Sequence, residues 1–162
     1  MLELHRTGWT LTAYRVKEGH RPVAWLEVEH GGGRILIGQT SYEFGPSGPG
    51  TPDEIVLWEG RKPLAMAQWN KGSRPTVDVH VGQEILRMAP VGWLDRQGVV
   101  YGLRGTEVGS LQRSGSSART VKADLPPRLS LPVRLFLVGL MLGVWDRSDD
   151  EAVEATETLG GA

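Results

Sequence analysis

Cysteine is absent from the 162 residues of this chain, and several other features that would define a function are missing with it. Without cysteine there is no disulfide framework and no thiolate nucleophile, and a zinc site would depend on histidine and carboxylate ligands. Neither the phosphate-binding pattern G-x-x-x-x-G-K-[S/T] nor the dinucleotide-binding pattern G-x-G-x-x-G occurs. We therefore expect no metal and no cofactor.

A second absence concerns export and membranes. The N-terminal residues MLELHRTGWT contain no basic segment followed by an apolar run, so we expect no export signal and a cytoplasmic protein. The most apolar stretch is LPVRLFLVGLMLGVWD, Leu131 to Asp146, and it has only 11 apolar or glycine residues between Arg134 and Asp146. Crossing a bilayer takes about 20 such residues, so no transmembrane span is expected.

Charge is distributed unevenly along the chain. Residues 61–128 carry 11 basic and 5 acidic side chains, a net charge of +6, whereas residues 129–162 carry 2 and 6. Most of the acids in the last segment lie in SDDEAVEATETLGGA, which has no large apolar stripe and is typical of a solvated tail. The sequence predicts one domain over residues 1–147 and an acidic disordered tail over residues 148–162.

Before Leu131 the chain shows short alternation of apolar and polar residues, which is typical of half-buried antiparallel strands. Five glycines lie between strand-like runs at spacings of 19, 22, 22 and 23: Gly19, Gly38, Gly60, Gly82 and Gly105. Turns that need positive φ favour glycine, so this spacing indicates five hairpins. With the flanking strands they predict roughly 10 to 12 strands, in a meander that curls closed to remove its edges. GPSGPGTP, Gly45 to Pro52, predicts a long exposed loop.

The apolar run needs a buried position, because its large side chains cover every direction around a helix axis. An eight-stranded barrel is filled by its own side chains, whereas about 12 strands leave room for a helix roughly 10 Å across. We therefore predict a mainly β fold, a closed antiparallel barrel around a buried hydrophobic helix at residues 131–146. In such a helix Gly139 and Gly143 would let large barrel side chains approach the backbone.

The segment KADLPPRLSLPVRLFLVGLMLGVWD, Lys122 to Asp146, places an Ala-Asp, a proline-containing link, an apolar helix and a terminal aspartate in order. In this it resembles the Tubby C-terminal-like superfamily, within it the branch of LURP-one-related proteins and phospholipid scramblases. The resemblance implies a twelve-stranded barrel closed around a hydrophobic C-terminal helix. Scramblases carry further acidic residues between the Ala-Asp and the helix, in the segment proposed to bind calcium. Here that segment offers only Asp124, which argues against a calcium site and against scrambling.

Two patterns could carry catalysis. Asp78 and His80 in TVDVHVG would project from one face of a strand, as a base and its orienting group or as two metal ligands. No third partner is evident, and a solvated strand face explains the pair as well. HGGG, His30 to Gly33, resembles an esterase oxyanion-hole motif, but no G-x-S-x-G accompanies it, so we interpret it as a hairpin turn.

The basic middle segment is the feature best suited to an anionic partner. Its candidate binding residues are Arg61, Lys62, Lys71, Arg74, Arg113, Arg119 and Lys122. We predict a non-enzymatic binding or regulatory domain that recognises anionic phospholipid headgroups at a membrane surface, in preference to nucleic acid. A small hydrolase using Asp78 and His80 is one alternative. A purely structural domain with a protein partner, or a homodimer, is the other, and we interpret most of the six tryptophans as barrel packing.

Overall fold

The computed structural model describes residues 1–8, 12–29, 31–72, 74–91, 96–114 and 119–160, with side chains up to Asp146. The elements in chain order are β1 (Leu2–Thr7), β2 (Ala13–Glu18), β3 (Arg21–Glu29), β4 (Gly32–Ile37), β5 (Thr40–Pro46), β6 (Glu54–Glu59), β7 (Lys62–Asn70), β8 (Thr76–Val81), β9 (Glu84–Val91), β10 (Gln97–Tyr101), the short 3-10 helix η1 (Leu103–Gly105), β11 (Glu107–Ser114), β12 (Thr120–Asp124) and α1 (Leu131–Gly160).

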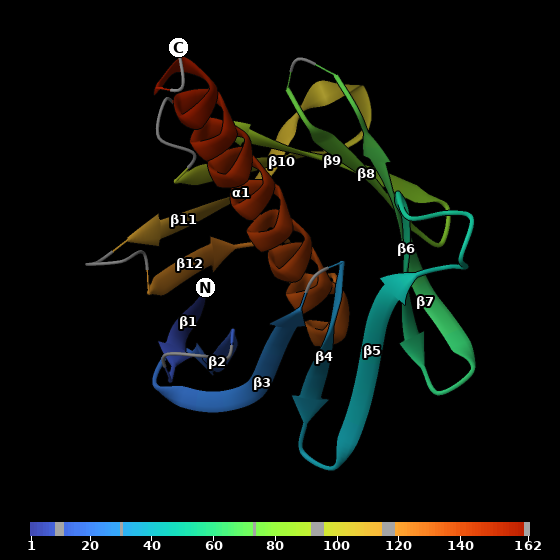
Figure 1. Cartoon of the computed structure of the whole chain (residues 1–162). Coiled ribbons are helices and arrows are strands. Elements are labelled where there is room, and N and C mark those ends of the chain that lie inside the picture. The colour runs from blue at the N-terminus through green and yellow to red at the C-terminus, as the bar shows by residue number, and fades with distance from the viewer. Residues whose placement is uncertain (9–11, 30, 73, 92–95, 115–118, 161–162) are drawn as a thin grey trace.

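The strands form one closed barrel, in which each strand pairs with its neighbours in sequence and β1 pairs with β12. All these pairings are antiparallel, and the closing one aligns Leu2 with Ala123 and Leu4 with Val121. Closure leaves no open sheet edge, which would otherwise be a template for aggregation. The predicted closed antiparallel barrel is confirmed, and Figure 1 shows its strands arranged around α1.

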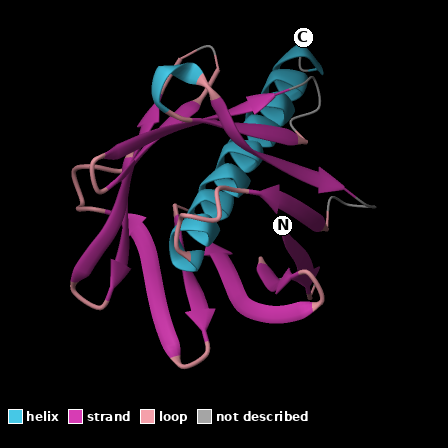
Figure 2. Ribbon diagram, turned by 180° about the vertical axis from the view of Figure 1, so that it is seen from behind, coloured by secondary structure: helices cyan, strands magenta, loops and turns pink. Residues whose placement is uncertain are grey.

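The helix α1 is the core of the barrel. From Leu135 to Trp145 every side chain except those of the two glycines is at most 4 % exposed. Figure 2 shows the helix passing through the ring of strands, so its apolar surface is covered from all sides by the inward-facing residues of the barrel. The predicted buried position is therefore confirmed, and no helix in the described part of the chain is long and apolar enough to cross a membrane.

The five hairpin glycines share one end of the barrel. Gly19, Gly38, Gly60, Gly82 and Gly105 all have positive φ, between 59° and 73°, as the sequence predicts. In the first four turns the residue after glycine is not among the positive-φ residues, which is the type II′ pattern that suits the twist of a hairpin. Because strand direction alternates, all five turns lie at the end where α1 begins. We call this the helix-entry end, and the opposite end, which α1 leaves past Asp146, the helix-exit end.

Glycines in α1 make room for large barrel side chains, as the sequence predicts. A Cβ atom built on Gly139 would lie 2.7 Å from Cζ of Phe44 on β5, and one on Gly143 would lie 3.5 Å from Cζ2 of Trp69 on β7. The Phe44 ring also stacks edge-on against Phe136, with centroids 5.6 Å apart. On its other side it approaches Gly33, which explains one glycine of the HGGG pattern as a packing requirement of β4.

Other parts of the structure differ from the sequence expectations. Gly45 and Pro46 belong to β5, so the loop from the GPSGPGTP segment is shorter than expected. The backbone of α1 continues as helix to Gly160, past the expected end at Asp146, through a segment rich in the helix formers alanine and glutamate. The domain division at residue 147 stays a prediction, because the structure describes no side chain beyond Asp146.

Candidate functional site

A polar layer closes the interior of the barrel at the helix-exit end. Arg6 on β1 pairs in register with Tyr14 on β2, and both continue the inward-facing series that begins with Leu2 and Leu4. On β11, which β12 alone separates from β1, the Arg113 guanidinium lies 5.0 Å from the ring centroid of Trp145. Cationic and aromatic side chains from three strands therefore meet the last buried turn of α1.

Hydrogen bonds tie this layer to the rim. The Arg6 amide donates to the Arg119 carbonyl at 2.9 Å, and Arg119 Nη2 donates to the Gly8 carbonyl at 3.0 Å. The Nε of Arg6 is buried and has no hydrogen-bond partner in the described part of the chain. A buried donor without a partner is unfavourable, so a ligand oxygen that accepted from Arg6 would gain affinity.

The polar layer contains charges of both signs around the Tyr14 hydroxyl. Burial raises the pKa of Tyr14 above its ordinary value of 10.0, because the phenolate would lose hydration. Arg6 and Arg113 oppose that shift and Asp146 adds to it, so these three charges are close enough to act on the same hydroxyl. Arg6, Arg113 and Arg119 outnumber the Asp146 carboxylate here. Among the residues whose side chains the structure describes, the layer therefore has a local positive excess suited to an anion.

The seven basic residues selected from the sequence lie in three places. Arg113 and Arg119 belong to the helix-exit rim, and Lys71 and Arg74 follow β7 at that same end, where Lys71 pairs with Asp53 at 3.0 Å. Arg61 and Lys62 form part of the β6–β7 turn at the helix-entry end. Lys122 faces outward on β12, in register between Glu3 and Gln112. The structure therefore brings four of the seven to one end, and sequence reasoning missed Arg6.

The Asp78 and His80 pair lies on the outer face of β8, as predicted, but the two side chains have different surroundings. Arg87 Nε donates to Asp78 Oδ1 at 2.7 Å, and Asn70 Nδ2 donates to Asp78 Oδ2 at 3.0 Å. Hydrogen bonding from Arg87 lowers the pKa of Asp78 below its ordinary value of 3.8. The carboxylate is thus directed at Arg87 and Asn70 instead of orienting the imidazole, an arrangement that does not favour the hydrolase alternative.

Replacing Arg87 by Gln is expected to raise the Asp78 pKa back towards 3.8. Because the folded-state pKa is depressed, the stabilisation is present above about pH 4 and is lost as the pH falls through the folded-state value. Urea unfolding at neutral pH should show the variant as the less stable protein, and the difference should shrink in acid. An NMR titration of the Asp78 carboxyl measures the pKa directly. Arg21→Gln, at the exposed first position of β3, is the matched control, and an unchanged Asp78 pKa in Arg87→Gln would contradict the assignment.

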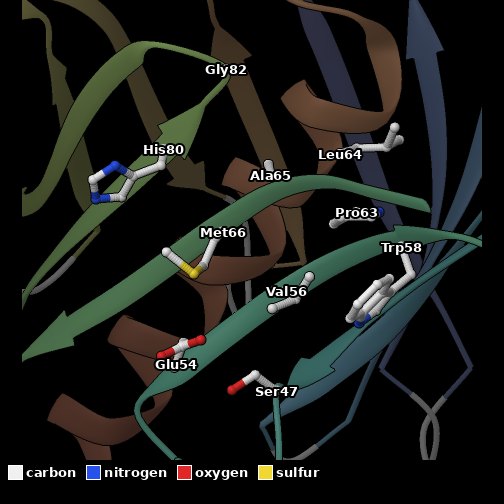
Figure 3. A pocket seen from close by; sticks show the side chains of 10 residues that line it. All are labelled: Ser47, Glu54, Val56, Trp58, Pro63, Leu64, Ala65, Met66, His80 and Gly82. Atoms are coloured by element: carbon white, nitrogen blue, oxygen red, sulfur yellow. The ribbon is translucent and has the colours of Figure 1, made fainter. Parts of the chain in front are cut away.

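A second feature is an open hollow of about 420 Å³ on the outer wall, over β6, β7 and β8. Figure 3 shows Val56, Met66 and the Trp58 ring along it, with Glu54 and Ser47 at one side and His80 at the other. Among the residues that line this hollow, His80 alone was named from the sequence as a candidate for chemistry. The hollow could have been suspected from Val56 and Met66, which are apolar although they alternate with the core residues of their strands and so face outward.

Other candidate chemistry has less support. The described residues contain no group of three or more metal-ligating side chains, and the expectation of no metal stays a prediction.

The tryptophans differ in their burial. Trp69 and Trp145 are core residues, as the packing interpretation expects, whereas Trp25 and Trp58 are half-buried. Trp9, Trp93 and His30 lie outside the described residues.

No protein-family model, no curated protein and no solved structure gives a significant match to this chain.

Proposed function

We propose that this protein is a non-enzymatic binding domain whose helix-exit end recognises anionic phospholipid headgroups at a membrane surface. The observation that carries the proposal is the convergence on one rim of Arg6 on β1, Arg113 on β11 and Arg119, which directly precedes β12. Guanidinium groups suit phosphate because their planar N–H donors match its oxygens.

The position of the rim also supports a surface role. Lys71 and Arg74 follow β7 at the same end and add to its positive charge, although Asp53 offsets Lys71. Polybasic groups near an anionic leaflet are attracted over roughly a Debye length, and each contributes about 1 kcal/mol close to the surface. A rim of this kind binds headgroups without entering the hydrocarbon, so no membrane-spanning helix is needed.

The architecture supports a place in the Tubby-like superfamily as part of the proposal. The resemblance at Lys122 to Asp146 implies twelve strands around an apolar C-terminal helix, and the barrel has this arrangement. Asp124 is exposed at the end of β12. We therefore propose lipid recognition without calcium.

Co-sedimentation with liposomes tests the proposed function. We expect binding to vesicles that contain phosphoinositide, weaker binding at physiological than at low salt, and none to neutral vesicles. The double variant Arg6→Gln with Arg119→Gln should bind roughly 30-fold more weakly, because two charges contribute about 2 kcal/mol. The bond from Arg6 to the Arg119 carbonyl comes from the backbone amide and does not depend on the side chain, whereas glutamine at position 119 keeps a side-chain amide donor. A thermal melt checks that the variant is folded.

The matched control removes the same charge from the helix-entry end. Arg61→Gln with Lys62→Gln should change the affinity less than twofold, because both residues lie at the opposite end of the barrel. Equal losses in the two double variants would show attraction by net charge alone, and absence of binding to anionic vesicles at low salt would also refute the proposal.

A further inference from the structure

The outer wall of the barrel carries a row of three apolar residues and one histidine that crosses four strands, and we call it the apolar row. Val56 on β6 pairs with Met66 on β7, Met66 pairs with His80 on β8, and His80 pairs with Ile85 on β9. Met66 is 36 % and Ile85 46 % exposed, which places both among the most exposed large apolar residues described. The next row contains Gln68, Asp78 and Arg87 and is polar, as solvated barrel walls usually are.

The hollow begins where this row meets β5. The residue paired with Val56 is Gly45, and a Cβ atom built there would have no neighbour within 4 Å. The floor is formed by Val56 and Met66, with Pro63 and Leu64 towards the helix-entry end. Figure 3 shows these side chains along a trough that is open above, between the Glu54 carboxylate and the Trp58 ring.

Polar groups at the two ends of the trough lack partners. Neither the Glu54 carboxylate nor the Trp58 indole N–H makes a side-chain hydrogen bond or an ion pair in the described part of the chain. A comparable pair on β3 behaves differently, since Trp25 Nε1 donates to Glu27 Oε1 at 3.1 Å. Trp25 and Glu27 are only two positions apart on the same face of β3, so their side chains reach each other. Glu54 and Trp58 are four residues apart, about 13 Å along an extended strand, and cannot satisfy one another.

We propose that this trough binds an extended peptide segment of a partner protein, with a lysine or arginine about four residues from an apolar residue. The cation lies against the Glu54 carboxylate and the apolar side chain against the Trp58 face, while the residue midway packs on Val56 and Met66. Alternate residues of an extended peptide point the same way, so positions one, three and five meet the trough together. Because the trough is open along its length, it covers one side of a peptide but would enclose little of a small molecule. This site is on a different wall from the proposed lipid-binding rim, and the two are tested separately.

The capped synthetic peptide Arg-Ser-Val-Ser-Leu is the probe, and the indole N–H signal of Trp58 is the readout in heteronuclear NMR spectra of the full chain. The Trp58→Phe variant assigns that signal. We expect a saturable shift of the Trp58 signal, with the affinity about fivefold weaker for Glu54→Gln, as loss of one exposed ion pair predicts. Glu107→Gln, an exposed acid on β11, is the matched control and should stay within twofold of the unmodified chain. Met66→Asp should abolish binding, and its dispersed spectrum should show that the fold is intact.

Several results would overturn the proposal. One is an unmoved Trp58 signal at several millimolar peptide, and another is equal affinity for the charge-reversed peptide Glu-Ser-Val-Ser-Leu. Hexylammonium binding as tightly as the peptide would assign the trough to small amphiphilic cations instead. Concentration-dependent self-association that Met66→Asp removes, seen by sedimentation, would assign the apolar row to a second copy of this chain.

Discussion

Replacing Leu140 by Asp is expected to abolish soluble expression of this protein. Leu140 is 3 % exposed in the middle of α1, inside the barrel. Truncating a buried leucine costs about 2 to 5 kcal/mol, and an unpaired buried carboxylate adds several more. Domains of this size are stable by about 5 to 15 kcal/mol, so the total approaches or exceeds what the fold can lose. The measurement is the soluble fraction after expression, with circular dichroism of any soluble protein.

The control for that variant is Leu140→Met, which nearly conserves volume and should cost less than about 1.5 kcal/mol. It separates loss of the buried apolar group from sensitivity of the position to any change. A soluble Leu140→Asp protein with the unfolding midpoint of the unmodified chain would contradict the placement of α1 in the core.

Replacing Gly139 by Ala is expected to destabilise the unmodified protein but to stabilise a variant that lacks the Phe44 ring. The new Cβ would lie 2.7 Å from Phe44 Cζ, and the ring cannot easily retreat because Gly33 and Phe136 flank it. Overpacking costs about 1 to 3 kcal/mol, partly offset by about 1 kcal/mol from the better helix propensity of alanine. We expect a net loss of up to about 2 kcal/mol.

The Phe44→Leu background removes the three nearest neighbours of that Cβ, which all belong to the ring. In the Phe44→Leu background the overpacking cost is absent and the better helix propensity of alanine remains. Adding Gly139→Ala to this variant should therefore raise its free energy of unfolding. Urea denaturation of the four proteins in this cycle gives the coupling energy, for which neighbouring side chains typically show about 0.5 to 3 kcal/mol. Additive effects would show that Phe44 and Gly139 do not share this space.

The main features of the fold follow from sequence because each has a local cause. An apolar run without a polar face must be buried, and regularly spaced glycines that need positive φ define hairpins. The strand Leu2–Thr7 departs from the simple alternation of apolar and polar residues, because Leu2 and Leu4 are followed by polar Arg6 at an inward position. That exception is informative, since Arg6 is also part of the polar layer at the helix-exit end.

The candidate sites were harder to predict, because they depend on register across strands. Val56, Met66 and His80 form one row only through the pairing of β6, β7 and β8. A shift of one residue would turn the apolar face of a strand outward and is excluded by the alternation, but a shift of two residues would keep that face inward and put other side chains in the row. The alternation in the sequence does not distinguish between such registers. In the same way, Arg61 and Lys62 resemble Arg113 and Arg119 as cations in a basic segment. The alternation of strand direction is what puts them at opposite ends.

The location of the core in the last helix has a consequence for synthesis. A ribosome releases the twelve strands before α1, and β1 cannot close against β12 until more than a hundred residues have emerged. Until then the nascent chain is an incomplete sheet whose apolar face has nothing to cover it. Hairpins at the five glycine turns can form as they appear, since their contacts are local, but the cooperative native state requires the C-terminal segment. Premature termination should therefore be far more damaging for this protein than for a domain whose core is assembled from its first residues.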